Sequence, residues 1–173
     1  VIFLRGLSMI KVDFLKTLTL LYVEDDVQVR EKFVIILNKL FKKVFIASDG
    51  VEGLAQYNQS NIEGSYIDLI ISDISMPNMD GVALLEHIRQ IDKHIPFIFT
   101  TAYTNSEYLI SSIQQGVTSY FVKPVDAKEI IYQVQKDCEL KQKEKELSHY
   151  QHEIEEYMNV IDKVAMVCMF DLN

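Results

Sequence analysis

The stretch IDLIISDISMPNMDG, residues 67–81, decides the fold predicted for this chain. Its apolar positions, among them Leu69, Ile70 and Ile71, are typical of a strand that is buried on both faces of a parallel sheet. Asp73 stands where that strand ends, and Asp80-Gly81 is expected to begin the next helix. Because ligands of open α/β sheets bind outside the carboxyl ends of the strands, Asp73 is a candidate functional residue.

Short apolar runs and helical patterns alternate on both sides of this segment. Strands are expected at 17–23, 43–48, 66–72, 95–101 and 118–122, and helices at 27–41, from 49, at 80–91, at 106–116 and from 126 onward. Alternating units of this kind predict a parallel sheet with helices on both faces. We therefore expect an α/β fold with a doubly wound, five-stranded parallel sheet in the flavodoxin-like order 2-1-3-4-5 and a long C-terminal helical extension.

The composition excludes several classes of function. The 173 residues carry a net charge of −8, which is a poor electrostatic match for nucleic acid. No run of about eighteen apolar residues exists, so no membrane span is expected. The start, VIFLRGL, is too short for a signal peptide, and Met9 is a candidate true start. Cys138 and Cys168 lack zinc-site spacing and are expected to be cytosolic thiols, which favours a cytoplasmic protein.

The C-terminal part predicts one long helix, because no Pro or Gly occurs between residue 126 and about 167. Apolar residues recur there every seven positions, at Leu140, Leu147, Ile154 and Ile161. A second series three residues later consists of Lys143, Tyr150, Tyr157 and Val164, in which Lys143 is the one poor position. This heptad pattern favours a coiled coil and a homodimer. In a parallel pair Glu139 would face Glu144, so the flanks do not specify a parallel dimer. A lone exposed helix, or one packed on a further domain, is the alternative.

These patterns predict four parts of the chain. Residues 1–16 form an N-terminal extension, 17–136 the α/β domain and 137–163 the coiled-coil linker. The last part, 164–173, reads VAMVCMFDLN, which is typical of a strand followed by the turn of a hairpin. We expect it to be the start of a second domain.

The ends of the predicted strands carry side chains that could bind a ligand or take part in a reaction. Neighbouring strand ends present acids, hydroxyls and a lysine: Glu24, Asp25 and Asp26 after the first strand, Asp73 at the third, Thr100 and Thr101 at the fourth, and Lys123 after the fifth. Crowded carboxylates need a cation, and oxygen ligands near solvent suit Mg²⁺. Magnesium, carboxylates, a lysine and a hydroxyl are suited to phosphoryl transfer, in which a carboxylate can be the nucleophile.

Four motifs occur in order along the chain, LLYVEDD, DLIISDISMPNMDG, IFTTA and SYFVKP. With these motifs, residues 17 to about 136 resemble the response-regulator receiver domain of bacterial two-component signalling. The resemblance implies that Asp73 is the phospho-acceptor and that Mg²⁺, or Mn²⁺ as its substitute, binds beside it. Asp25 would be a direct metal ligand, Glu24 would act through water, and Ser75 would offer its backbone carbonyl.

The resemblance also implies roles outside the acidic cluster. Thr101 matches the switch hydroxyl that bonds the phosphoryl group, whereas Thr100 is expected to point to the other face of the strand. Lys123 would bind a phosphoryl oxygen, and Tyr120 matches the aromatic switch residue. The remaining assignments are structural: Pro124 after a cis peptide bond, Pro77 and Gly81 in the loop after Asp73, and Asp26 as a helix cap.

The function implied by the resemblance is a signalling switch rather than an enzyme. A histidine kinase or histidine phosphotransfer protein would phosphorylate Asp73, and the C-terminal helix would carry the signal to an output domain. The last ten residues resemble the beginning of a PAS sensory domain. Two alternatives remain, a dimerising interaction module that is not phosphorylated and a Mg²⁺-dependent phosphohydrolase with an aspartate nucleophile. The second alternative is weakened by Ser75, because such enzymes often have an acid two residues after the nucleophile.

Overall fold

The computed structural model describes residues 10–102 and 116–170, with side chains described through residue 161 and at 163. Five parallel strands form one sheet: β1 (Thr19–Val23), β2 (Lys43–Ala47), β3 (Leu69–Asp73), β4 (Phe97–Thr101) and β5 (Ser119–Val122). Their order is β2-β1-β3-β4-β5, which confirms the predicted topology. β1, β3 and β4 are buried along their whole length, as expected for strands covered on both faces.

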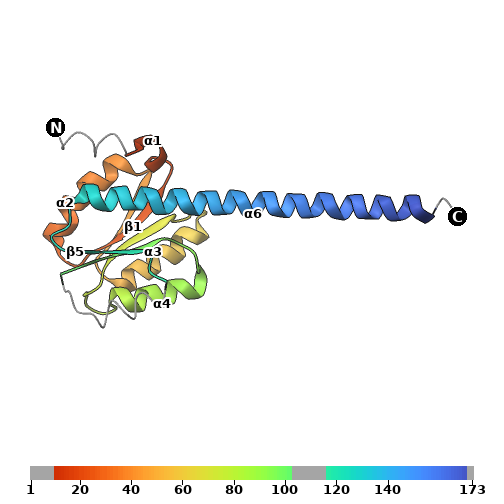
Figure 1. Cartoon of the computed structure of the whole chain (residues 1–173). Helices are drawn as coiled ribbons and strands as arrows, with labels where there is room; N and C mark the ends of the chain where they lie inside the picture. The colour runs from red at the N-terminus through yellow and green to blue at the C-terminus, as the bar shows by residue number, and fades with distance from the viewer. Residues whose placement is uncertain (1–9, 103–115, 171–173) are drawn as a thin grey trace, which may run out of the picture. The chain divides into compact units, whose positions relative to one another are not determined.

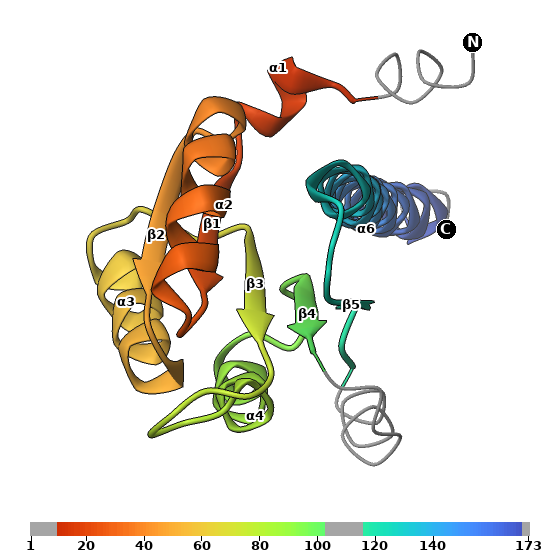
Figure 2. The ribbon, with the colours of Figure 1, turned by 90° about the vertical axis from the view of Figure 1, so that its left-hand side faces the viewer.

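Helices cover both faces of this sheet (Figure 1). They are α1 (Val12–Leu15), α2 (Val27–Leu40), α3 (Gly50–Ile62), α4 (Gly81–Ile91) and α6 (Ala127–Phe170). One core lies between the sheet and the helices α2 and α6, and it includes Leu37 of α2 and Ile130 and Val134 of α6. The other core lies against α3 and α4, which occupy the opposite side of the sheet in Figure 2. The helix predicted at 106–116 falls almost entirely outside the described residues.

Three helices begin with an aspartate that follows a strand or a loop at the carboxyl edge of the sheet. Asp26, Asp49 and Asp80 are the N-caps of α2, α3 and α4, and each side chain accepts a hydrogen bond from a backbone N–H group in the first turn. A capping aspartate satisfies amide groups that have no partner within the helix. These caps hold the strand-to-helix turns, and therefore hold the strand ends that the turns connect.

Part of the predicted N-terminal extension belongs to the folded domain. Leu15 of α1 is fully buried in the core beneath α2 and α6. The backbone N–H of Lys11 donates a hydrogen bond of 2.6 Å to the side-chain oxygen of Gln135, in the first turns of α6. Lys11 and Leu15 of this segment therefore contact the folded domain.

The chain divides into two compact units, Val1–Cys138 and Glu139–Asn173, and α6 contributes to both. The helix predicted from residue 126 onward is confirmed. The strand predicted for the beginning of 164–173 is wrong, because residues 164–170 are helical and continue α6. An isolated strand has no neighbouring strand to pair with its backbone, whereas each residue added to an existing helix gains a hydrogen bond.

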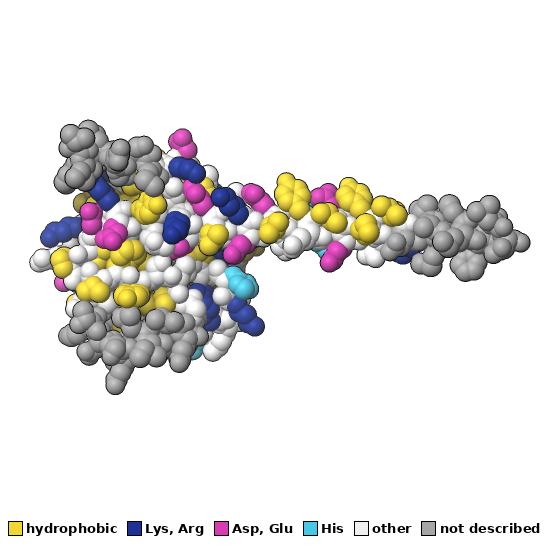
Figure 3. Space-filling model, in the orientation of Figure 1, with side chains coloured by type: hydrophobic (Ala, Val, Ile, Leu, Met, Phe, Trp, Pro, Cys, Tyr) yellow, Lys and Arg dark blue, Asp and Glu magenta, His cyan; other side chains and the backbone are white. Residues whose placement is uncertain are grey.

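The part of α6 in the second unit has a row of exposed apolar side chains. These are Leu140, Leu147, Tyr150, Ile154, Tyr157 and Ile161, all of them predicted seam positions. Figure 3 shows hydrophobic side chains gathered along this part of the helix. None of the helices in the described ranges has the length and apolar content needed to cross a membrane.

Candidate functional site

Three carboxylates meet at the carboxyl edge of the sheet. Oxygen atoms of Glu24, Asp25 and Asp73 all lie within 4.8 Å of one another. Glu24 follows β1 and is 1% exposed, whereas Asp73 ends β3 and is 6% exposed. Asp25 is exposed to solvent. The parallel register, in which Val23 pairs with Ser72, places the ends of β1 and β3 side by side and so creates this acidic cluster.

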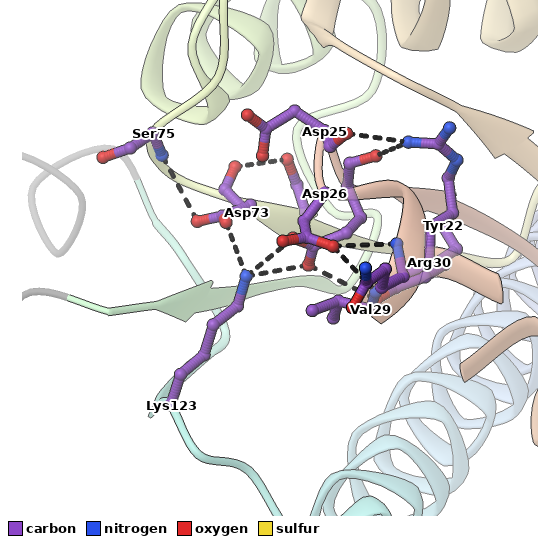
Figure 4. Close-up of polar contacts among 11 residues, drawn as sticks. Tyr22, Asp25, Asp26, Val29, Arg30, Asp73, Ser75 and Lys123 are labelled. Atoms are coloured by element: carbon purple, nitrogen blue, oxygen red, sulfur yellow. Dashed lines mark hydrogen bonds and ion pairs between the residues drawn. The ribbon is translucent and has the colours of Figure 1, made fainter. Parts of the chain in front are cut away.

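Lys123 connects two of these carboxylates (Figure 4). Its Nζ lies 2.6 Å from Oδ2 of Asp73 and 2.8 Å from both carboxylate oxygens of Glu24. The backbone N–H of Lys123 donates to the carbonyl of Thr101, which continues the pairing of β5 with β4. A cis peptide bond joins Lys123 to Pro124. Burial lowers the pKa of Lys123, but its bonds with Asp73 and Glu24 outweigh burial and raise the pKa above the usual value.

Burial by itself shifts the pKa of Glu24 upward, in the opposite direction from its effect on Lys123. Removal from water raises the pKa of Glu24, and the nearby Asp73 and Asp25 raise it further, although Lys123 opposes the shift. Tyr22 lies beneath Glu24, with its hydroxyl 3.4 Å from a carboxylate oxygen of Glu24. Burial, followed by the charge of Glu24, raises the pKa of Tyr22 well above its usual value, so its hydroxyl keeps its proton. Tyr22 was not among the predicted site residues.

Arg30 was also missed by the prediction. Its Nη1 donates hydrogen bonds to the backbone carbonyls of Glu24, at 2.5 Å, and Asp25, at 3.1 Å. Asp26 holds the same turn from the other side, because its Oδ1 accepts from the N–H groups of Gln28 and Val29. The available signal was the position of Arg30 one turn after the cap, since helix side chains lean toward the N-terminus. Arg30 and Asp26 therefore fix the backbone that presents Glu24 and Asp25.

The loop after Asp73 is anchored at several points. The N–H of Ser75 lies 3.3 Å from Oδ1 of Asp73, and the N–H of Gly81 donates to the carbonyl of Ile74 at 2.8 Å. A side chain on Gly81 would collide with the backbone carbonyl of Asp73 and press on the ring of Phe99. The close approach of α4 to the end of β3 therefore requires glycine at this position, as the turn at Asp80-Gly81 suggested.

The remainder of this loop is tied to the start of α3. Asn78 adopts a positive φ of 63°, and its side-chain amide donates a hydrogen bond of 2.7 Å to Oδ2 of Asp49. The N–H of Gly50 donates to the carbonyl of Met79, and the N–H of Met79 donates to the carbonyl of Pro77. These contacts thus anchor the loop beside Asp73 to the start of α3.

The predicted switch residues lie on β4 and β5. Thr101 ends β4 and is buried, and Tyr120 of β5 has 44% of its surface exposed. Thr100 is paired with Asp73 in the β3–β4 register. As predicted, Thr100 belongs to the other face of the strand from Thr101, because it lines a pocket beside Tyr22 on the α2 side of the sheet.

The acidic cluster fits a divalent cation. One lysine offsets only part of the charge of Glu24, Asp25 and Asp73, whose oxygens are close enough for a single ion. An oxygen-only ligand set with an exposed member is typical of Mg²⁺, which takes few carboxylates and keeps several waters. The cluster therefore fits the magnesium site that the resemblance to receiver domains implies.

Comparisons with known proteins identify the family. The family model of the response regulator receiver domain matches residues 20–135. Sporulation initiation phosphotransferase F of Bacillus subtilis is 32% identical over 126 residues, which cover 70% of this chain and 94% of that protein. The transcriptional regulatory protein GlrR of Escherichia coli is 35% identical over 118 residues, covering 68% of this chain. The chain spans about a quarter of the length of GlrR (25%).

Solved structures agree with this result. The CheY-like receiver domain protein of Methanospirillum hungatei is 28% identical, covers 74% of this chain and 98% of its own, and has a TM-score of 0.66. The CheX–CheY–BeF3–Mg complex of Borrelia burgdorferi matches with 26% identity and a TM-score of 0.64 over 75% of this chain and 95% of that chain. The chain therefore belongs to the response regulator receiver domain family, whose members act in phosphorylation-based signalling.

Proposed function

We propose that Asp73 is the phospho-acceptor of this receiver. Receiver domains are signalling modules that interact with histidine kinases or phosphotransfer proteins. The observation that carries the assignment is the position of Asp73, which is held at the end of a buried strand with Oδ2 only 2.6 Å from the ammonium group of Lys123. A phospho-acceptor oxygen must receive a highly charged phosphoryl group. A rigidly held carboxylate with a fixed cation beside it meets this requirement, because the cation offsets the incoming charge.

The transfer is an in-line displacement at phosphorus. A carboxylate oxygen of Asp73 forms a bond to the phosphorus atom while the bond between phosphorus and the partner's histidine nitrogen breaks. The imidazole nitrogen keeps the electron pair of that bond. Lys123 donates a hydrogen bond to a phosphoryl oxygen and so offsets the charge that arrives. Its pairing with Glu24 and Asp73 keeps it in place before the transfer.

Glu24, Asp25, Asp73 and the backbone carbonyl of Ser75 would hold Mg²⁺, with Glu24 acting through water. The bound cation supplies positive charge that offsets the repulsion between the carboxylates and the incoming phosphoryl oxygens. Mn²⁺ prefers similar oxygen ligands and is expected to substitute. Arg30 and Asp26 stabilise these metal ligands, because they hold the backbone of the turn that carries Glu24 and Asp25.

Thr101 and Tyr120 convert phosphorylation into a change of surface. The Thr101 hydroxyl bonds the phosphoryl group, and the ring of Tyr120, now 44% exposed, turns inward behind it. The hydrogen bond of 2.7 Å from Lys123 N–H to the Thr101 carbonyl supports this coupling, since it joins the two strands that carry the switch. β5 leads directly into α6, which carries the change toward an output domain.

The exposed apolar row on α6 supports a homodimer through this helix. Leu147, Ile154 and Ile161 recur at heptad spacing, and each is about 60% exposed, at 60%, 61% and 59%. A second copy of the same helix offers a matching row that would remove these side chains from water. Phosphorylation would then act on the packing or rotation of the paired helices.

Intact mass spectrometry tests the assignment. The full chain is incubated with acetyl phosphate and Mg²⁺ as wild type, as Asp73→Asn and as Asp13→Asn, an exposed acid of α1 that serves as the matched control. We expect one phosphoryl adduct in the wild type and the control, none in Asp73→Asn, and none when Mg²⁺ is chelated. An adduct on Asp73→Asn would overturn the assignment. Absence of any adduct, under conditions that phosphorylate another receiver, would favour an unphosphorylated interaction module.

A further inference from the structure

A pocket of about 450 Å³ lies behind the acidic cluster, on the α2 side of the sheet. Its walls include aromatic and aliphatic side chains and a few polar groups, among them Tyr22, Val29, Phe33, Thr100, Lys123 and Val125. All of these residues belong to the first compact unit. The volume is in the range of pockets that hold small molecules, which are generally apolar with a small number of placed polar groups.

The hydroxyl of Thr100 faces this pocket and has no hydrogen-bond partner among the described residues. Thr100 is 3% exposed, and its Oγ1 makes no hydrogen bond within the part of the chain that the structure describes. A buried hydroxyl in this condition is unfavourable, and native proteins rarely leave one unpaired. Valine has the same shape as threonine and would fill this place in the strand without that penalty. The unpaired hydroxyl therefore points to a molecule that bonds with it in the pocket.

The surrounding side chains restrict what that molecule can be. The rings of Tyr22 and Phe33 are stacked, with centroids 5.9 Å apart and an interplanar angle of 27°, and both line the pocket. Aromatic walls favour a flat aromatic ligand over a flexible chain. Three charged groups line the pocket: Glu24 and Lys123, which are bound to each other at 2.8 Å, and Lys32 of α2, which is exposed to solvent. A charged ligand would compete with this pair, so a neutral one is favoured.

We propose that this pocket binds a small, uncharged aromatic molecule with one hydroxyl or N–H group, which forms a hydrogen bond with Thr100. The ring lies between the stacked aromatic wall and the aliphatic side chains of Val29 and Val125. Figure 4 shows Tyr22, Val29 and Lys123 around the same region as the acidic cluster. The pocket adjoins the acidic cluster and shares Lys123 and Glu24 with it.

The test uses phenol as the hydroxyl-bearing probe and toluene as its counterpart without the hydroxyl. Each is titrated into the full-length ¹⁵N-labelled chain, and amide shifts in two-dimensional NMR spectra report affinity and location. Thr100→Val removes the hydroxyl at constant shape, and Val29→Phe fills the pocket from α2. Ser60→Ala removes a buried hydroxyl that is bonded to the Tyr57 carbonyl in α3 and is the matched control.

Phenol is expected to give saturable shifts centred on the pocket in the wild type and in Ser60→Ala. Thr100→Val should weaken phenol about three- to tenfold, as expected for one lost hydrogen bond, and should leave toluene unchanged. Val29→Phe should abolish the binding of both probes. The proposal is overturned if phenol shows no saturable shifts at millimolar concentration, if the shifts lie elsewhere, or if Thr100→Val binds phenol as well as the wild type does.

Discussion

Replacing Lys123 by methionine tests how the acidic cluster is held together in the absence of a metal ion. Methionine keeps most of the length of the lysine stem but removes the ammonium group. That group makes an ion pair of 2.8 Å with Glu24 and one of 2.6 Å with Asp73, whose side chains are 1% and 9% exposed. The substitution therefore leaves two buried carboxylates without their cation.

The expected loss of stability follows from this burial. Removing one partner of a buried ion pair costs about 3–5 kcal/mol, because the remaining charge is left uncompensated. The Lys123 side chain is 21% exposed, so solvent screens part of the interaction. We therefore expect Lys123→Met to lower the free energy of unfolding by about 2–3 kcal/mol at pH 7.5. Urea titration in the presence of EDTA measures it, with Lys39→Met, an exposed lysine of α2, as the control.

The pH dependence separates this explanation from a general loss of packing. In the wild type the raised pKa of Lys123 means that its contribution is complete below the ordinary value of 10.5 and is lost as pH rises through the folded pKa. In the variant, Glu24 loses its cation while burial still raises its pKa, so its charged form is penalised above that pKa. The deficit should shrink as pH falls from 7.5 toward 4.5. A deficit below about 1 kcal/mol at pH 7.5, or one that is equal at pH 5, would refute the reasoning.

Three further predictions address the metal, the loop and the helix. In the absence of Mg²⁺, Asp25→Asn should raise the free energy of unfolding by about 1 kcal/mol, because it removes Coulomb repulsion between carboxylates that lie within 4.8 Å of one another in water. The same substitution should abolish the rise in melting temperature that Mg²⁺ causes in the wild type. Gly81→Ala should destabilise the chain by about 1–3 kcal/mol in urea and slow phosphorylation by acetyl phosphate, because the new methyl group presses on the Asp73 carbonyl. Ile154→Asn should weaken dimerisation in sedimentation equilibrium, and an unchanged mass across concentrations would contradict the coiled coil.

Local patterns were sufficient to predict much of this protein from its sequence. The apolar run that ends in Asp73 predicted a strand buried on both faces, because a parallel strand covered by helices needs apolar residues on each side. Asp26 and Asp80 could be expected as caps because the capping bond spans two or three residues. The order of the strands followed from the alternation of strands and helices, since few connections are physically allowed.

The tertiary structure decided what depends on contacts between distant parts of the chain. Lys123 reaches Glu24 across 99 residues and Asp73 across 50 residues, and no local pattern encodes either contact. Residues 164–170 read as a strand by composition, yet they are helical because they continue an existing helix. Only the three-dimensional structure shows that the Thr100 hydroxyl has no hydrogen-bond partner within residues 10–102 and 116–161. Periodicity reports the solvent side of each element, whereas distances between side chains arise when separate elements pack together.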